Sequence, residues 1–558
     1  MADINIIKDT IQELPYIHLV GELSQDDNGN ITGSFNIDTK EGLPQLEWRV
    51  RIESVYPYKV NGHESIHFFN DTLIDYPHIM EGNFLCLHSS FYPNERLQLL
   101  SDLSQVKEWV SKYYVNGQRD EHYEHLVVNN EPINKAYYSF LFTNVNYNFP
   151  SGDYGRVTFF NLYTEKSKEM YPIYNYGVFS FKSDNTVHSK EHKCLWESNV
   201  YQKNPYHGIY CKLEQQPAIH GNFIIKDYCQ LNNLLDSPQL KYIYTAIRNA
   251  GYINQTYSGY LPLMLGYNIP SGELHWQTIM LPVDELPMKG EKIKVVGTKI
   301  NYWISKFING HILWASTVNC DYKYYFGRGA YPKSITSKNI LLLGVGAIGS
   351  MVATTLVRCG ARKITLADFD DKQPENICRS EYAFMTGVGP KIHEMLNILS
   401  TISPYVECRL NHDLDMIIKY AVTNKKKIKD VQSILNEFDY IFDCTTDNSL
   451  MYCLEELNIK ARIINISITN HAKELVCAFS PNIRNYVETM YTKILNNDTI
   501  DLFYPTGCWN PTFKASYNDI ATMVQFSMKH IVKMLTGEEN ITNFYVSEDS
   551  NGIIINRL

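Results

Sequence analysis

The sequence predicts a multidomain α/β protein whose carboxy-terminal part folds as a doubly wound parallel sheet of the Rossmann-like kind. From about residue 335 onward, buried-strand patterns alternate with helical patterns, which is typical of a parallel sheet with helices on both faces. The chain has 558 residues, enough for three or four domains at roughly 150 residues each. Hydrophobic residues make up 44% of the chain and charged residues 20%, so each domain can bury an ordinary core.

Runs of apolar residues place the elements of that sheet. Residues 340–343 are continuously apolar, as expected of a parallel strand buried on both faces. A helix ending at Gly360 should follow, with these apolar residues on one side: Ile348, Met351, Val352 and Leu356. Further elements are expected in chain order: a strand at 363–370, a helix at 391–402, strands at 439–448 and 461–469, and a helix at about 518–535.

The rest of the chain has a different pattern. Alternation predicts a strand at 46–55 and a short strand at 63–69, and a helix is expected at 103–114, so this part is α+β. Between about residues 120 and 325 the chain is dense in Tyr and Phe with short strand-like runs, which predicts a β-rich middle domain. We place the domains at 1–130, 131–330 and 331–558.

Composition excludes several classes of protein. Lys and Arg number 51 against 60 Asp and Glu, and a net charge of −9 argues against a protein that grips nucleic acid. No apolar run approaches the roughly 20 residues that cross a bilayer, and the amino terminus does not resemble a secretion signal. The 12 cysteines form no CxxC pair, which indicates free thiols rather than disulfides or a zinc clip. We therefore expect a cytoplasmic protein that binds neither nucleic acid nor membranes.

A glycine-rich loop joins the first strand of the predicted sheet to its helix. Gly344, Gly346 and Gly349 form GxGxxG, which lets phosphate oxygens approach the backbone and the positive end of the helix. Asp368 ends the next strand, 24 residues after Gly344, where a carboxylate can hold ribose hydroxyls. This much indicates nucleotide binding and fits a nicotinamide dehydrogenase equally well.

Polar and cationic side chains follow that second strand: Asp370, Asn376 and Arg379 in ADFDDKQPENICR, and Lys391 in GVGPK. A dehydrogenase has no use for a fixed Arg and Lys beside the phosphates. An enzyme that activates a carboxylate with ATP does, because charge builds on the phosphoryl oxygens as the carboxylate attacks the α-phosphorus and pyrophosphate leaves. FDCTTDN then supplies Asp443 and Asp447, one of which can hold the Mg²⁺ that accompanies ATP.

In this order, the motifs GVGAIG, ADFD with its downstream Asn376 and Arg379, GPK and DCTTDN resemble the adenylation (ThiF-type) domain of ubiquitin-activating enzymes. Bacterial relatives that activate sulfur-carrier proteins share the pattern. The resemblance covers about residues 335–480. It implies that Asp368 binds the ATP ribose and that Asp447 serves Mg²⁺ and the adenylate. It implies a phosphate-binding role for three side chains: Asn376, Arg379 and Lys391.

The same resemblance implies a homodimer. Such adenylation domains often borrow an arginine from the partner subunit, and Arg328 is the candidate here. The chain departs from the sulfur-carrier subgroup because it has no paired CxxC zinc motifs.

Two cysteines are candidate nucleophiles. Cys508 lies in a turn-rich segment, YPTGCWNPTF, just before a predicted helix, where a thiol can have a lowered pKa. Free cysteines are more often small buried hydrophobes. The position and GCWNPTF nevertheless resemble the acceptor-cysteine segment of ubiquitin-activating enzymes and their bacterial fusion relatives, which implies a catalytic Cys508.

Cys86 lies in YPHIMEGNFLCL, which resembles the active-site segment of ubiquitin-conjugating enzymes, where a His-Pro-Asn turn lies about nine residues before the cysteine. Pro77 precedes Cys86 by 9 residues here. Tyr76 and His78 stand where that turn has His and Asn, so His78 either supports the oxyanion or only satisfies the loop backbone. The resemblance covers roughly residues 10–130 and implies an α+β ubiquitin-conjugating-like domain.

With both resemblances in one polypeptide, the chain is similar to the bacterial fusion enzymes of cyclic-oligonucleotide antiphage signalling (CBASS). They imply that a protein carboxy terminus, that of a cyclic-nucleotide synthase or a ubiquitin-like protein, is adenylated with ATP and Mg²⁺. The acyl group then passes to Cys508, to Cys86 and finally to the lysine of a target.

Three alternatives remain open. In the first, the chain activates a sulfur-carrier or other ubiquitin-like protein, and its own amino-terminal domain is a non-catalytic binding domain. In the second, it is a nicotinamide oxidoreductase. In the third, it is a scaffold with a degenerate nucleotide fold. The oxidoreductase leaves Arg379 and Lys391 unexplained. The complete set of motifs from Gly344 to Asp447 argues against a scaffold.

Overall fold

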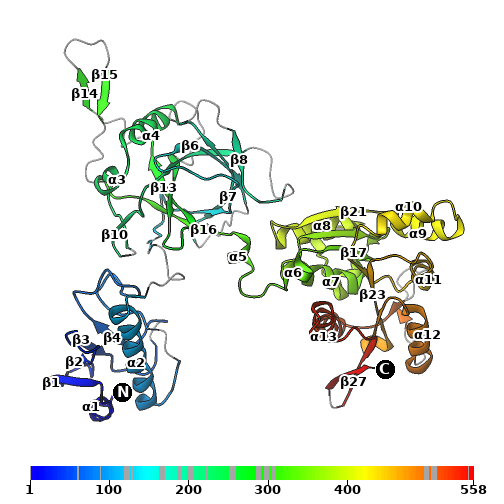
Figure 1. Ribbon diagram of the computed structural model, residues 1–558, viewed down its shortest axis with the longest axis horizontal. Helices are drawn as coiled ribbons and strands as arrows, with labels where there is room; N and C mark the ends of the chain where they lie inside the picture. Colours follow the sequence, from blue (N-terminus) through cyan, green and yellow to red (C-terminus); the bar gives the residue numbers. More distant parts are fainter. Residues whose placement is uncertain are drawn as a thin grey trace. The chain divides into compact units, whose positions relative to one another are not determined.

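The computed structural model describes most of the chain (Figure 1). The described residues are 2–59, 62–87, 90–118, 126, 128, 130–162, 170–185, 190–197, 205–221, 223–250, 259–283, 291–294, 301–304, 310–495, 502–503, 512–550 and 552–557. The chain divides into two compact units. One comprises Met1–Lys193 and Asn204–Asn319, and the other comprises Cys194–Lys203 and Cys320–Leu558.

The amino-terminal part is a four-stranded antiparallel meander in the order β1-β2-β3-β4, accompanied by two helices. Its elements are α1 (Ile4–Gln12), β1 (Ile17–Gln25), β2 (Ile31–Ile37), β3 (Leu46–Ile52), β4 (Ile66–Phe69), α2 (Glu95–Trp109) and the π-helical turn η1 (Val110–Val115). Strand β3 alternates buried and exposed side chains, with Trp48 fully buried, because its apolar residues recur with the period of two that a half-covered sheet requires.

The structure differs from the sequence prediction at two places in this part. Helix α2 begins eight residues earlier than expected, at Glu95, because the Asn94 side chain caps it by accepting from the Leu97 N–H at 3.0 Å. The predicted helix at 103–114 is therefore the end of α2 together with η1. Helix α1 and strands β1 and β2 had not been predicted.

The middle part is built around a closed ring of seven strands. In the order β5-β16-β13-β12-β9-β6-β7, each strand pairs with the next, and β7 pairs again with β5, while β8 extends from β7. The strands are β5 (Tyr137–Phe142), β6 (Tyr154–Asn161), β7 (Ile173–Ser183), β8 (Glu191–Lys193), β9 (Tyr206–Lys212), β12 (Tyr260–Asn268), β13 (Leu274–Pro282) and β16 (Trp314–Asn319). Accessory elements are β10 (Ala218–His220), β11 (Phe223–Ile224), α3 (Tyr228–Leu234), α4 (Ser237–Ala250), β14 (Glu291–Lys294) and β15 (Asn301–Ile304).

Aromatic residues fill the ring. Phe149, Phe181, Tyr210 and Trp276 are buried against one another, with ring centroids between 4.6 and 5.7 Å apart. The high Tyr and Phe content of this part of the sequence therefore has a packing role.

The carboxy-terminal unit contains an eight-stranded sheet in the order β21-β18-β17-β22-β23-β24-β27-β28. Its strands are β17 (Asn339–Leu343), β18 (Lys363–Ala367), β21 (Glu407–Leu410), β22 (Tyr440–Asp443), β23 (Arg462–Thr469), β24 (Glu474–Phe479), β27 (Phe544–Asp549) and β28 (Gly552–Arg557). The first five in the sheet are parallel, and in chain order they run 3-2-1-4-5, the doubly wound arrangement. The last three pair antiparallel and extend the doubly wound parallel sheet, an extension that the sequence analysis does not predict.

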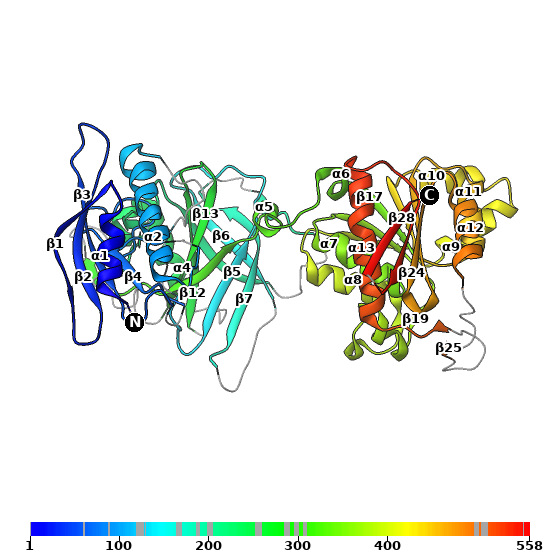
Figure 2. The ribbon, with the colours of Figure 1, turned by 90° about the horizontal axis from the view of Figure 1, so that it is seen from below.

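Helices cover both faces of this sheet (Figures 1 and 2). They are α7 (Ala347–Arg358), α8 (Lys391–Ile402) and α13 (Tyr517–Thr536) on one face, and α9 (Leu414–Thr423), α10 (Ile428–Leu435), α11 (Asn448–Glu456) and α12 (Ile483–Ile494) on the other. Shorter elements are α5 (Tyr322–Tyr325), α6 (Lys333–Thr336), β19 (Asp371–Lys372), η3 (Pro374–Arg379), η4 (Phe384–Thr386), β20 (Gly389–Pro390), η5 (Asn470–Ala472), β25 (Leu502–Phe503) and β26 (Thr512–Phe513). Within the described ranges, no helix is both long enough and apolar enough to cross a membrane.

Candidate functional site

A cavity of about 550 Å³ lies at the carboxyl ends of the parallel strands, beside β17 and β22, where the strand order reverses. Ligands of doubly wound sheets bind in this crevice. The cavity is lined by most of the residues that the sequence singled out: Gly344, Gly346, Asp368, Asp370, Asn376, Arg379, Lys391 and Asp447. Residues that are far apart in the sequence thus meet around one space large enough for a nucleotide.

Two glycines of the loop, Gly346 and Gly349, have different roles. Gly346 caps α7 and lines the cavity, and a side chain there would meet nothing within 4 Å, so the space beside the helix terminus is open. Gly349 does not line the cavity. A β-carbon on Gly349 would lie 1.9 Å from the Gly344 oxygen, so this glycine lets α7 pack closely against the end of β17.

Asp368 ties the glycine loop to the end of β18. Its Oδ2 accepts from the Val345 N–H at 2.7 Å, and its Oδ1 accepts from the Asp370 N–H at 2.8 Å. Burial raises the pKa of Asp368, and the nearby ammonium of Lys391 acts in the opposite direction. The carboxylate is thus fixed at the cavity wall, where its remaining acceptor capacity faces a ligand.

Lys391 is held at the cavity by Asp370. Its Nζ lies 2.8 Å from Asp370 Oδ2, and its backbone N–H donates to the Asp370 carbonyl at 3.0 Å. A second, buried ion pair supports the chain that leads to α8: Lys372 Nζ lies 2.5 Å from Glu394 Oε2, and Glu394 Oε1 accepts from the Ala383 N–H. These contacts therefore fix the position of the ammonium group of Lys391, the first residue of α8, at the cavity.

Asn376 and Arg379 come from the short helix η3. The Asn376 Oδ1 accepts from the Gln373 N–H at 2.8 Å, so its side chain also stabilises the start of η3. Arg379 lines the cavity and forms no ion pair with any residue in the described part of the chain. Its guanidinium is therefore available to an anion.

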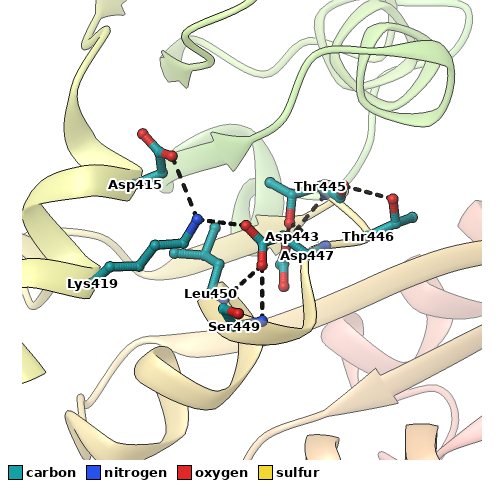
Figure 3. A network of polar contacts seen from close by, with 8 residues as sticks. All are labelled: Asp415, Lys419, Asp443, Thr445, Thr446, Asp447, Ser449 and Leu450. Carbon is teal, nitrogen blue, oxygen red and sulfur yellow. Dashed lines mark hydrogen bonds and ion pairs between the residues drawn. The ribbon is translucent and has the colours of Figure 1, made fainter. Parts of the chain in front are cut away.

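A polar network at the start of α11 fixes Asp447 (Figure 3). Asp447 Oδ1 caps the helix by accepting from the N–H groups of Ser449 at 2.8 Å and Leu450 at 3.1 Å. Lys419 Nζ lies 2.5 Å from Asp447 Oδ2 and 3.8 Å from Asp415 Oδ2. Burial favours a higher pKa for Asp447, but the hydrogen bond from Lys419 and those from the helix amides outweigh it, and the pKa lies below its usual value.

The sequence analysis missed Lys419 and Asp415, although Asp415 also lines the cavity. Their spacing of four residues on one helix was the available signal.

Of the two carboxylates that the sequence offered for Mg²⁺, only Asp447 lines the cavity. Asp443 is buried, and its oxygens accept from the Thr445 hydroxyl at 2.7 Å and the Asn465 amide at 2.9 Å. Burial raises the pKa of Asp443. Asp443 therefore supports the turn after β22, and Asp447, with Asp415 beside it, supplies the carboxylate oxygens at the cavity wall, the donor type that Mg²⁺ prefers.

Cys508 lies outside the described residues, and its catalytic role stays a prediction. The described residues on either side of it are close to the cavity: Leu502 and Phe513 pair as part of the β25–β26 ladder, and both line the cavity. Cys444 also lines the cavity, but burial raises the pKa of its thiol well above the usual value, so it stays protonated.

Cys86 and His78 lie together in the amino-terminal part. The Cys86 N–H donates to the His78 carbonyl at 2.7 Å, and both residues line a pocket of about 110 Å³. His78 has a φ of +63°, and its Nε2 lies 3.2 Å from the Tyr113 hydroxyl. The Trp109 indole donates to the Pro77 carbonyl at 2.8 Å and holds the same turn against α2. The turn therefore brings His78 and the half-buried Cys86 to the wall of one pocket.

Arg328, the candidate for the partner-subunit arginine, is exposed in a turn and does not line the cavity of its own subunit. Its role stays a prediction.

Comparison with known proteins finds a match to a family model in the carboxy-terminal part of the chain. Residues 326–551 match the model of the ThiF family. The chain is 26% identical over 243 residues to the "ATP-dependent ubiquitin transferase-like protein Cap2" of Enterobacter hormaechei, covering 42% of this chain and 39% of that protein. It is 31% identical over 144 residues to the protein of the same name from Pseudomonas aeruginosa, covering 25% and 24%. The chain thus spans at most about two fifths of the length of these curated relatives.

Solved structures give a weaker likeness. The chain resembles Escherichia coli MccB with ATP at 13% identity and a TM-score of 0.29, covering 40% of this chain and 64% of that one. It resembles Escherichia coli tRNA N6-threonylcarbamoyladenosine dehydratase, TcdA, with AMP at 19% identity and a TM-score of 0.26, covering 39% and 93%. These scores establish only a partial likeness. The prediction of a ThiF-type domain is confirmed by the match over residues 326–551, and the conjugating-type amino-terminal domain stays a prediction.

Proposed function

We propose that this protein is an ATP-dependent adenylyltransferase that activates the carboxy terminus of another protein. One observation carries the proposal: the glycine loop, Arg379, Lys391 and Asp447 converge on a single cavity at the switch point of the sheet. Two anion-binding cations, a helix amino terminus and an ionised carboxylate are the groups that adenylate formation requires. The match to the ThiF family and the names of the curated relatives support the same activity.

The residues of the cavity divide the work of the first step. Asp368 holds the ribose hydroxyls, and the open space at Gly346 admits the phosphates to the amino terminus of α7. The substrate carboxylate attacks the α-phosphorus, the bond to the bridging oxygen breaks, and pyrophosphate leaves. Arg379 and Lys391 stabilise the charge that develops on the phosphoryl oxygens, and Asn376 donates its amide to them. Asp447 would hold Mg²⁺, which neutralises phosphate charge when bound.

The second step transfers the acyl group to Cys508. The thiolate forms a bond to the acyl carbon, the bond from that carbon to the phosphate oxygen breaks, and AMP leaves. Leu502 and Phe513, described residues before and after Cys508 in the sequence, line the cavity, which supports this residue as the acceptor.

The third step moves the acyl group from Cys508 to Cys86 by thiol exchange and then to a lysine of a target protein. His78 stands beside Cys86 and can donate to the oxyanion that forms when the amine attacks. This part of the proposal rests on the Cys86 turn and on the resemblance to conjugating enzymes. The relatives named as ubiquitin transferase-like proteins support it.

We further propose the biological setting. The activated protein is a cyclic-nucleotide synthase or a ubiquitin-like protein encoded nearby, as in CBASS. The enzyme works in the cytoplasm as a homodimer to which Arg328 contributes across the interface.

The test uses the full chain, Mg-ATP and the full-length proteins encoded by adjacent genes, followed on non-reducing gels and by intact mass. Wild type should release pyrophosphate and form a thiol-sensitive adduct, Cys508→Ala should form none, and Cys86→Ala should accumulate the adduct on Cys508. Cys378→Ala and Cys229→Ala, which remove exposed cysteines, are the matched controls. AMP without an adduct on either cysteine would favour an adenylating enzyme whose amino-terminal domain only binds.

A further inference from the structure

Residues 78–86 form a small closed loop in the amino-terminal part. The Cys86 N–H donates to the His78 carbonyl at 2.7 Å, and Ile79 and Leu85 form an antiparallel bridge next to this bond. The two pairings hold the backbone of His78 beside that of Cys86. Both residues line the same pocket of about 110 Å³, so an acyl group carried on Cys86 starts from a wall that His78 shares.

The backbone at His78 lies in the left-handed region, with a φ of +63°. A residue other than glycine adopts this region at a conformational cost, and it persists only where surrounding contacts hold it. Two side chains from α2 and η1 supply such contacts. The Trp109 indole donates to the Pro77 carbonyl at 2.8 Å, and the Tyr113 hydroxyl lies 3.2 Å from His78 Nε2.

Tyr113 contacts the imidazole in two ways. Its hydroxyl, which can donate or accept, is within hydrogen-bond distance of Nε2, and its ring lies 5.3 Å from the His78 ring between centroids. Tyr113 is buried and belongs to η1, a π-helical turn of a kind that is frequent at functional sites. The hydrogen bond and the ring contact together restrict the rotation of the imidazole at the wall of the pocket.

We propose that Tyr113 is a positioning residue for acyl transfer from Cys86 to an amine, and that it acts through His78. The inference rests on the proposed function. There the amine nitrogen bonds to the acyl carbon of the Cys86 thioester, the carbon–sulfur bond breaks, and the amine proton passes through solvent to the thiolate. The oxyanion formed on the way is best stabilised by a donor that is already in place. Tyr113 and the nucleotide cavity belong to different compact units, so adenylation does not depend on this residue.

Tyr113→Phe tests the role, because it removes the hydroxyl and keeps the ring that packs against His78. Tyr114→Phe removes a hydroxyl from the next residue of η1 and is the matched control. The full chain is loaded with Mg-ATP and the full-length proteins encoded by adjacent genes, and excess EDTA then stops activation. L-lysine is added as the amine, and loss of the thiol-sensitive adduct from Cys86 is followed by intact mass and peptide mapping.

A second variant separates positioning through His78 from simple packing. His78→Gly removes the imidazole, and glycine adopts the positive φ without strain. If Tyr113 acts through His78, adding Tyr113→Phe to His78→Gly should slow discharge by less than about twofold further. Alkylation of Cys86 by iodoacetamide, measured without ATP, reports whether the pocket is intact.

The expected result is a loss confined to discharge. Tyr113→Phe should lose the Cys86 adduct to lysine at least about tenfold more slowly than wild type. Its release of pyrophosphate and its rate of Cys86 alkylation should stay within about twofold of wild type. Tyr114→Phe should match wild type in every measurement.

Four outcomes would overturn the inference. Discharge of Tyr113→Phe at the wild-type rate would show that the hydroxyl is dispensable while the proposed function stands. An equal loss of discharge and alkylation would assign Tyr113 to the packing of the pocket. A tenfold further loss in the His78→Gly background would show that Tyr113 does not act through His78. A wild-type protein that never carries an adduct on Cys86 would reject the relay itself, and with it this role for Tyr113.

Discussion

Lys419 Nζ lies 2.5 Å from Asp447 Oδ2, while the other oxygen of that carboxylate caps α11. Asp415 lies on the far side of the ammonium, at 3.8 Å. One lysine therefore balances two carboxylates at the wall of a cavity that is proposed to receive a polyphosphate.

Replacing Lys419 by Met should weaken ATP binding. The change leaves Asp447 and Asp415 without their shared cation, and their negative charge then opposes that of the phosphates. We expect a loss of about tenfold in affinity, measured by calorimetry with metal-free ATP at low salt, because Mg²⁺ on Asp447 would compensate for the lost ammonium. Lys419→Arg keeps the charge and should bind nearly as wild type. Equal affinity in Lys419→Met and wild type would contradict this account of the network.

Arg379→Ala and Lys391→Ala should each slow pyrophosphate release while leaving the fold intact. Both cations face the position where charge develops in the proposed reaction, and removing such a group costs about 10²–10³ in rate. Single-turnover release of pyrophosphate is the measurement, with circular dichroism as the check on folding. Arg409→Ala removes an exposed arginine of β21 that pairs with Glu407 and should leave the rate unchanged. A similar loss in that control would point to a general electrostatic effect.

Gly349→Ala should destabilise the carboxy-terminal unit. Its added β-carbon would lie 1.9 Å from the Gly344 oxygen, an overlap that forces α7 away from β17. The expected cost is about 3 kcal/mol in the free energy of unfolding, read from denaturant titration. Gly329→Ala, where a β-carbon meets nothing within 4 Å, is the control. A Gly349→Ala protein as stable as that control would mean that the helix and strand can separate at little cost.

The buried pair of Lys372 and Glu394 should make stability depend on pH. Burial favours a higher pKa for Glu394, but the hydrogen bond from Lys372 and the other partners hold it below its usual value. A carboxyl group with a lowered pKa stabilises the fold above its unfolded pKa of about 4.3, and this contribution is lost as the pH falls through the folded pKa.

We therefore expect the free energy of unfolding of Glu394→Gln at pH 7 to be about 3 kcal/mol lower than that of wild type, because the buried ammonium of Lys372 loses its carboxylate partner. The gap should close as the pH is lowered below about 4. Thermal melts of both proteins between neutral and acidic pH measure it, and a gap independent of pH would refute the assignment.

The cavity was largely predictable because its residues follow from local rules. The glycine loop, Asp368 and Lys391 stand at the ends of strands and at a helix start, and the parallel order of the sheet brings those ends together. Helix α8 has the bounds that its apolar pattern predicted. Local rules do not decide whether Asp443 or Asp447 faces the cavity. That choice depends on the amide of Asn465, on another strand, which donates to Asp443.

The features that sequence reasoning missed are set by contacts between distant segments. In the sequence, Lys419 is an ordinary lysine in a helix. Its ion pair with Asp447 forms because β22 and α11 bring Asp447 beside it. The antiparallel strands β24, β27 and β28 have no pattern that separates them from parallel ones, because their direction follows from the connections between them.

The closed ring of the middle part has a consequence for handling the protein in solution. Because β5 pairs with both β16 and β7, the seven described strands of the ring leave no free edge among themselves, and the strand that extends from β7, β8, has three residues. The carboxy-terminal sheet ends in two edge strands, β21 and β28, and β28 carries the run Ile553, Ile554 and Ile555, with Ile554 exposed. When concentrated protein self-associates, intermolecular strand pairing should start at β28, and Ile554→Lys should suppress it.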